Sequence, residues 1–143
     1  MAQKAINGAE PLILDSSAIL AVLLEEPGYE GILERISNAP SVGVGAPTFV
    51  ETAMVLSSKL RRDARPHLNE FLREAAAEVI PLGPEHVDAA LDAFQRYGKG
   101  RHPAALNFGD CLTYSIAAVA GVPLLFTGND FIQTDIDTAN NKL

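Results

Sequence analysis

The chain has 143 residues, a formal net charge of −7 and a hydrophobic content of 48%. This length suits one globular domain with one core, and the composition is that of an ordinary globular protein without repeats or low-complexity tracts. The longest apolar stretches, residues 18–24 and 116–126, are too short or too interrupted to cross a bilayer, so we expect no membrane-spanning segment. The negative net charge at first argues against a nucleic-acid partner.

The start of the chain and its cysteine content favour a cytoplasmic protein. The first residues lack the apolar core of a secretion signal, and Cys111 is the only cysteine, which excludes an internal disulfide. The three histidines are scattered without the spacing of zinc ligands, so we expect no zinc site. Residues 1–10 are mixed and polar and are expected to form a flexible N-terminal extension, followed by a single domain over residues 11–143.

Hydrophobic periodicity divides the chain into alternating strands and helices. The short aliphatic run before Asp15 predicts a buried strand, Ser16 or Ser17 can cap the helix after it, and Pro47 favours the start of a later helix. In chain order we expect a strand at 11–15, helices at 18–26 and 29–37, a weak glycine-containing strand at 41–45, helices at 47–60 and 65–77, a strand at 78–82, helices at 84–97 and 107–120, and a strand at 123–126. This alternation predicts an α/β fold with a parallel sheet covered by helices on both faces.

Four acidic residues fall at the edges of these elements. Asp15 ends the first strand and Asp130 follows the last one, while Glu51 lies one turn into a helix and Asp110 lies in the first turn of another. In a parallel α/β fold, strand carboxyl ends and the helix amino ends beside them share one edge of the sheet. Four carboxylates gathered there would repel one another unless a cation neutralised them. The sequence therefore predicts a metal site.

Each of these acidic residues also has an ordinary structural interpretation. Asp15 could cap a helix, Asp110 could interact with a helix dipole, and Asp130 could be a turn residue. Glu51 is expected on the apolar face of its helix because it is spaced three and four residues from Met54 and Val55, although it could instead be a surface residue. The coincidence of all four at one sheet edge favours the metal site.

Carboxylates without histidine or cysteine suit Mg²⁺ or Mn²⁺, which prefer oxygen ligands and retain waters. Such ions activate a water and stabilise the charge that develops during phosphodiester hydrolysis. Neutral oxygens near the four carboxylates could orient them as a second shell, although each of these residues also suits a cap or turn; they belong to Ser17, Asn107, Thr127 and Asn129.

The basic residues are clustered. Four of the eleven Lys and Arg lie within residues 59–65, and three more lie within 96–101. One cluster follows the helix of Glu51 and the other precedes the helix of Asp110, so both could hold a phosphodiester backbone, with Arg61, Arg62 and Arg101 as candidate contacts. Solvated loop ends are an equally good explanation of the charge pattern alone.

Several segments resemble the PIN-domain ribonucleases, especially the VapC-type toxins of toxin–antitoxin operons. The resemblance covers about residues 11–135 and rests on Leu14-Asp15-Ser16-Ser17-Ala18, an internal Glu51, Asn107-Phe108-Gly109-Asp110-Cys111 and Phe126-Thr127-Gly128-Asn129-Asp130-Phe131. It implies a three-layer α/β/α sandwich around a parallel sheet of four or five strands. It also implies a homodimer that cleaves single-stranded RNA or tRNA with Mg²⁺ or Mn²⁺ and is blocked by a cognate antitoxin. Asp15, Glu51, Asp110 and Asp130 would then form the catalytic, metal-binding acidic quartet.

Some relatives in that family carry a further acidic residue after the last strand, where Asp135 is a poor match. The main alternative is a catalytically silent PIN fold that only binds a protein partner or RNA, against which stands the presence of all four carboxylates. A haloacid-dehalogenase-type phosphotransferase or a receiver domain would need a late lysine, and none lies between Lys99 and Lys142. A thiol mechanism at Cys111 lacks a histidine to activate it, so a small buried residue is the better interpretation.

Overall fold

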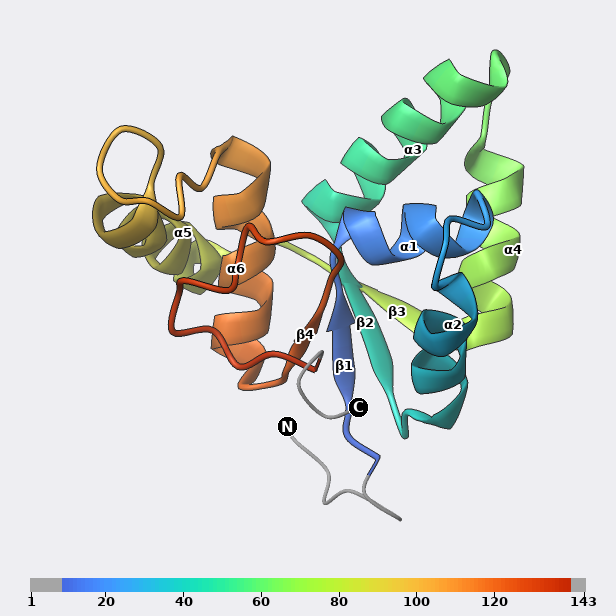
Figure 1. Ribbon diagram of the computed structural model, residues 1–143, viewed down its shortest axis with the longest axis horizontal. Helices are drawn as coiled ribbons and strands as arrows, with labels where there is room; N and C mark the ends of the chain where they lie inside the picture. Colours follow the sequence, from blue (N-terminus) through green and yellow to red (C-terminus); the bar gives the residue numbers. More distant parts are fainter. Residues whose placement is uncertain (1–8, 140–143) are drawn as a thin grey trace.

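The computed structural model describes residues 9–139, and the expected N-terminal extension therefore lies almost wholly outside the described residues. Four strands and six helices alternate along the chain (Figure 1): β1 (Leu12–Leu14), α1 (Ser16–Leu23), α2 (Tyr29–Asn38), β2 (Val42–Gly45), α3 (Ala46–Leu60), α4 (Arg65–Ala75), β3 (Ala77–Ile80), α5 (Pro84–Tyr97), α6 (Phe108–Ala120) and β4 (Leu124–Leu125). The strands form one parallel sheet in the order β3-β2-β1-β4.

Side chains of β1 alternate between two cores, as expected for a strand buried on both faces. Leu12 and Leu14 pack with α1, α2 and α4 on one face, whereas Ile13 packs with α5 and α6 on the other. Figure 1 shows these two groups of helices on opposite sides of the sheet. The three-layer α/β/α sandwich with a four-stranded parallel sheet is thus confirmed.

The segment at 41–45 is β2, a fully buried strand beside β1, and its glycines are what allow close packing there. A Cβ added at Gly45 would lie 2.6 Å from Ile116 Cγ1 of α6, and one added at Gly43 would lie 2.7 Å from Ile80 Cδ1. Glycine, which weakened the strand prediction, therefore marks the places where other side chains approach the backbone of the sheet.

Several expected boundaries were wrong by a few residues. The first helix begins at Ser16, two residues early, because the carboxylate of Asp15, and not a serine, caps it. The third strand ends at Ile80, before Pro81, which has no N–H to donate to a ladder. The tail after β4 returns to the sheet, where Leu124 forms a single parallel bridge with Thr138. Within residues 9–139, no helix is long and apolar enough to cross a membrane.

The close packing at Gly45 generates a stability prediction. Gly45→Ala should lower the free energy of unfolding by about 1–3 kcal/mol because the methyl group collides with Ile116. Gly31→Ala is the matched control, since nothing lies within 4 Å of a Cβ at this position in α2, and it should stabilise the protein by about 0.5–1 kcal/mol. Urea denaturation measures both changes, and equal effects of the two variants would contradict the packing argument.

Candidate functional site

Asp15 lies at the carboxyl end of β1 and is buried, with 7% of its surface exposed. Its carboxylate accepts hydrogen bonds from the backbone N–H of Ser17 at 3.1 Å and from the Ser17 hydroxyl at 2.6 Å. Burial raises the pKa of Asp15 above its usual value, and the hydrogen bonds from Ser17 partly offset that effect. Asp15 is therefore both the helix cap and a carboxylate held in the interior.

Ser17 also connects the two central strand ends. While its hydroxyl donates to Asp15, its oxygen accepts a hydrogen bond of 3.0 Å from the backbone N–H of Thr127, which follows β4. This contact joins positions 110 residues apart in the sequence. Of the residues expected to orient the carboxylates, Ser17 thus contacts Asp15 directly, whereas Thr127 contacts Ser17 through its backbone N–H.

Asp110 is fixed by reciprocal hydrogen bonds at the start of α6. The Asn107 side chain accepts from the Asp110 N–H at 2.8 Å, and the Asp110 carboxylate accepts from the Asn107 N–H at 3.1 Å. This capping box satisfies two backbone donors and orients the carboxylate at the amino end of the helix. Asn107, which we expected to orient a ligand, therefore positions Asp110 directly.

Glu51 reaches the site from α3, but the expected apolar burial of its helix face was wrong. Glu51 is exposed, as are Val50 (55%) and Met54 (66%), whereas the buried side of α3 carries Thr52 and Leu56. The apolar residues around Glu51 could not reveal this, because α3 is apolar on more than one side. Glu51 consequently faces outward from α3 and not into the core.

The Glu51 carboxylate lies against the amino end of α6. A Cβ added at Gly109 would lie 3.2 and 3.3 Å from its two carboxylate oxygens. Gly109 therefore leaves the room that lets Glu51 approach the turn that carries Asp110. Burial raises the pKa of Glu51, the charge of Asp15 raises it further, and a hydrogen bond from Ser16 lowers it.

Asp130 is exposed in the turn after β4 and completes the group of carboxylates. Burial raises the pKa of Asp110 to about 6; the hydrogen bond from Asn107 lowers it, and the charges of Asp130, Asp15 and Glu51 each raise it. The other three acidic side chains therefore all lie within electrostatic reach of Asp110. Asn129 lies beside Asp130 and is also exposed, and its carbonyl accepts from the N–H of Ile132.

The donor chemistry of this acidic quartet fits a hard divalent cation. All of its side chains offer carboxylate oxygens, and none of the ion pairs found within residues 9–139 involves them. As the side chains lie, no group of three or more His, Cys, Asp or Glu in that range is close enough to hold one ion. Binding of a cation would thus require the carboxylates to move closer together. Without the cation, their mutual repulsion opposes this approach.

Sequence reasoning missed a buried threonine pair beneath the site. The hydroxyls of Thr48 on α3 and Thr113 on α6 lie 2.8 Å apart, and both residues are buried. Thr113 also hydrogen-bonds to Asp15, which lowers the pKa of that carboxyl. The signal in the sequence was weak: Thr113, three positions after Asp110, is one of a few polar residues in a mostly apolar helix. The pair links the helices that carry Glu51 and Asp110.

A groove with a volume of about 520 Å³ adjoins the site between α3 and α6. Its lining is largely apolar and includes Val50 and Met54 on one side and Leu112 on the other, and Glu51 and Gly109 belong to it as well. Phe108, at the first position of α6, is 82% exposed beside this groove. The acidic quartet therefore borders a largely apolar groove through Glu51.

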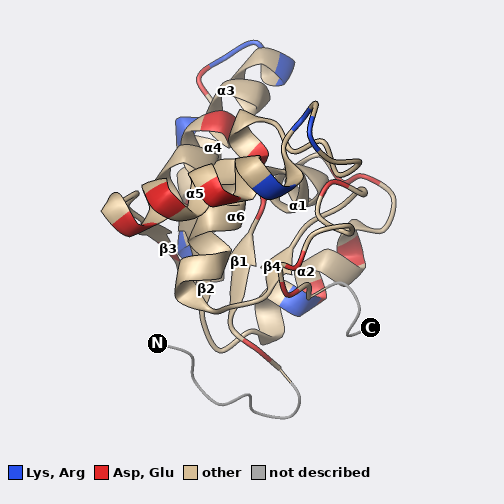
Figure 2. Cartoon of the chain, turned by 90° about the vertical axis from the view of Figure 1, so that its left-hand side faces the viewer, with Lys and Arg blue, Asp and Glu red and all other residues tan. Residues whose placement is uncertain are grey.

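The basic clusters lie at the same end of the molecule as the strand carboxyl ends. Figure 2 shows Lys and Arg at the tip of α3 and in the segment after α5, and Figure 1 shows both segments rising on either side of that edge. Arg61 and Arg62 are exposed at the end of α3. The guanidinium of Arg101 lies 4.9 Å from the ring centroid of Phe94.

Cys111, which follows Asp110 in α6, is buried, as expected from the sequence.

Comparison with known proteins identifies the family. The PIN domain profile matches residues 12–137. The chain belongs to the PIN-domain family. It is 37% identical over 125 residues to "Ribonuclease VapC" of Mycolicibacterium smegmatis, an alignment that covers 87% of this chain and 97% of the relative. It is 41% identical to "Ribonuclease VapC36" of Mycobacterium tuberculosis, covering 88% and 91%. These relatives place the chain among the VapC proteins of the PIN-domain family.

Solved structures share the fold at much lower sequence identity. VapC20 of Mycobacterium tuberculosis, described as a toxin that cleaves the sarcin–ricin loop, has a TM-score of 0.69 at 16% identity and covers 87% of this chain and 95% of its own. VapBC2 of Rickettsia felis, solved with a DNA fragment from its promoter, has a TM-score of 0.70 at 14% identity, covering 90% and 96%. The PIN-type sandwich is thus confirmed by structure as well as by sequence.

The raised pKa of Asp110 generates a prediction about stability and pH. Because the folded state holds this proton more tightly than the unfolded chain, the protein should gain stability as the pH falls through about 6 and lose it as the pH rises. In EDTA at pH 7, Asp110→Asn should therefore be more stable than the wild type, and the difference should shrink towards pH 4. Thermal unfolding across this range measures it, and a difference that does not change with pH would contradict the assignment.

Proposed function

We propose that the acidic quartet is the catalytic centre of a Mg²⁺- or Mn²⁺-dependent endoribonuclease that acts as the toxin of a toxin–antitoxin pair. The single observation that carries the proposal is the convergence of Asp15, Glu51, Asp110 and Asp130 from separate elements of the fold, where burial first and then the charges of the other three raise the pKa of Asp110. Membership of the VapC proteins supports the ribonuclease activity. The presence of the whole quartet disfavours a silent binding module.

In this proposal, Asp15, Asp110 and Asp130 would hold the cation, and Glu51 would hold a second ion or position the attacking water. A cation held there would supply an activated water and offset the negative charge that grows on the phosphate during hydrolysis. The protein orients two of the carboxylates: Ser17 orients Asp15, and Asn107 orients Asp110. The raised pKa of Asp110 also means that protons compete with the metal below about pH 6.

The substrate and partners follow from the same surroundings. Single-stranded RNA or tRNA can pass over the carboxylates with its phosphates between the two basic clusters. An acidic protein needs such local positive charge in order to bind a polyanion. Relatives described as toxin–antitoxin complexes, such as the one from Klebsiella pneumoniae, support a cognate antitoxin. An antitoxin segment that inserts Arg or Lys would neutralise the acidic quartet and block it. A homodimer in the cytoplasm completes the proposal.

A Mn²⁺ titration followed by thermal unfolding tests the metal site without knowledge of the RNA. A ligand that binds only the folded state at about 100 times its dissociation constant adds roughly 2.7 kcal/mol of stability. The wild type should show such a saturable rise in melting temperature, and Asp110→Asn should lose it. Asp92→Asn, which changes an exposed carboxylate on α5, is the matched control and should respond like the wild type.

Cleavage of total bacterial RNA by the same proteins provides the second readout. The wild type and Asp92→Asn should cleave in Mn²⁺, and Asp110→Asn should be inactive while remaining folded. Full activity of Asp110→Asn would refute the proposed centre. A wild type that neither binds Mn²⁺ nor cleaves RNA would instead favour the silent, partner-binding alternative.

The basic clusters generate a separate prediction about RNA affinity. Replacing Arg61, Arg62 and Arg101 by Gln should weaken the binding of single-stranded RNA and flatten the dependence of log K on log salt by about 0.7 for each phosphate that is no longer neutralised. Arg73→Gln is the control, because Arg73 is exposed in the last turn of α4, close to the opposite end of the sheet. Fluorescence anisotropy at several salt concentrations measures the slope, and an unchanged slope would assign these arginines to solvent or to the antitoxin.

A further inference from the structure

The turn that carries Asp130 has a hydrophobic anchor next to it. Phe131 is 1% exposed, and its ring centroid lies 5.3 Å from that of Phe126 at the end of β4. The Thr134 hydroxyl donates to the carbonyl of Phe131 at 2.8 Å and accepts from the N–H of Ile136 at 3.3 Å. The backbone from Phe131 to Ile136 is therefore folded on itself directly after Asp130.

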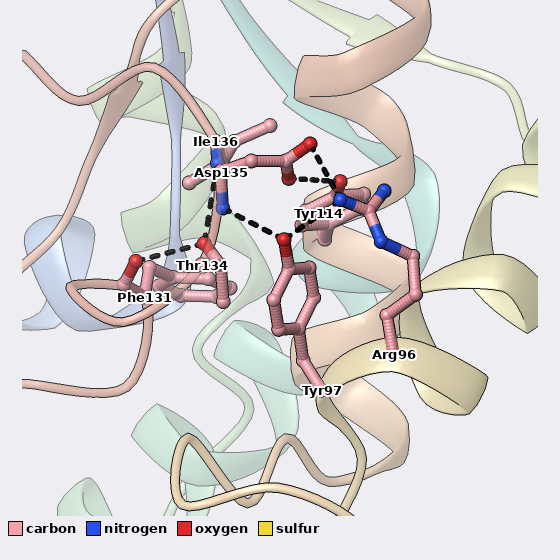
Figure 3. Close-up of polar contacts among 7 residues, drawn as sticks. All are labelled: Arg96, Tyr97, Tyr114, Phe131, Thr134, Asp135 and Ile136. Atoms are coloured by element: carbon pink, nitrogen blue, oxygen red, sulfur yellow. Dashed lines mark hydrogen bonds and ion pairs between the residues drawn. The ribbon is translucent and has the colours of Figure 1, made fainter.

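Asp135 ties this folded segment to α5 and α6 (Figure 3). Its carboxylate accepts hydrogen bonds from the Tyr114 hydroxyl and, at 3.0 Å, from the Arg96 guanidinium. Its backbone N–H donates to the Tyr97 hydroxyl at 3.2 Å, which in turn accepts from Arg96 at 2.8 Å. We refer to Asp135, Arg96, Tyr97 and Tyr114 as the Asp135 clamp.

The clamp connects Asp130 to the helix of Asp110. Tyr114 is four residues after Asp110 on α6, so the two side chains lie on the same face of the helix, one turn apart. Tyr114 is buried, and its ring lies 6.1 Å from that of Tyr97. The distance between Asp110 and Asp130 thus depends on a contact made one turn along α6 from Asp110 and five residues along the chain from Asp130.

Asp135 is occupied by this contact and does not join the acidic quartet. The hydrogen bond from Tyr114 is the largest cause of its lowered pKa, and Arg96 lowers the pKa further. The charges that act on Asp110 come from Asp130, Asp15 and Glu51. The late acidic residue that the family resemblance left without a role is therefore a paired carboxylate outside the site.

We propose that Asp135 is a positioning residue, which through Tyr114 and Arg96 sets Asp130 relative to Asp110 for binding of a divalent cation. This inference rests on the proposed function of the acidic quartet. In this inference, the clamp increases the affinity of the site for the cation and does not merely stabilise the fold. Phe131 anchors the turn of Asp130 in the core, and the clamp adds the contact with α6 that relates this turn to Asp110.

The test measures the Mn²⁺ dissociation constant of the full chain by calorimetry. Tyr114→Phe, which keeps the ring and removes the hydroxyl, and Asp135→Asn should each weaken Mn²⁺ binding about 10-fold. Because Tyr114→Phe removes only one of the two contacts of the Asp135 carboxylate, the double variant should bind Mn²⁺ no more weakly than Asp135→Asn alone. Asp137→Asn is the matched control, since it removes the same charge from an exposed position two residues further along the tail, and it should bind Mn²⁺ like the wild type.

A role in folding alone would lower the melting temperature of the metal-free variants and leave their Mn²⁺ dissociation constants unchanged, which would overturn the inference. Arg96→Gln provides a second route if Tyr114→Phe fails to fold, because Arg96 is half-exposed on α5, and it too should weaken Mn²⁺ binding. Asp110→Asn distinguishes failure of the clamp inference from failure of the proposed metal centre. If it loses Mn²⁺ while the clamp variants keep it, only the clamp inference fails; if it binds like the wild type, the proposed metal centre itself fails.

Discussion

Parallel pairing of β1 with both β2 and β4 is the constraint on which the rest of the molecule depends. It places β1 inside the sheet, with a strand on each edge, and brings the carboxyl ends of β1 and β4 together, where Ser17 bridges Asp15 and the backbone of Thr127. The crossover connections of a parallel sheet place helices above both faces, so the amino ends of α3 and α6 reach the same edge. Asp15, Glu51, Asp110 and Asp130 meet there because of this topology.

Gathering carboxylates at a partly buried edge costs stability, and the structure shows how the cost is limited. Hydrogen bonds from Ser17 and Asn107 oppose the effect of burial on Asp15 and Asp110, but the pKa of both remains raised. None of the ion pairs within the described range offsets the acidic quartet. A site that opposes its own ionisation in this way would be stabilised by a bound cation, which supports the proposed metal centre.

The surroundings divide into rigid and open parts. Beneath the carboxylates, the buried pair Thr48 and Thr113 joins α3 to α6, and the Asp135 clamp joins the tail to α5 and α6. Above them, the exposed side of α3 and Phe108 border an apolar groove, and basic residues occupy the tips beyond it. An RNA strand that approaches the carboxylates would therefore pass an apolar groove and basic residues.

The sequence by itself determined the class of fold, the order of the elements and three of the four carboxylates at element ends, because hydrophobic periodicity and turn residues are local signals. Asp15, Asp110 and Asp130 each stand where a strand or helix begins or ends. The family resemblance identified Glu51 as a member of the quartet, but the sequence did not predict which side of α3 is buried. The packing of α3 through Thr52 and Leu56 decides that Glu51 and its apolar neighbours face outward. The roles of Gly109, Thr113 and Asp135 likewise came from the tertiary structure alone. Each depends on a contact between segments far apart in the chain, and no local pattern encodes such a distance.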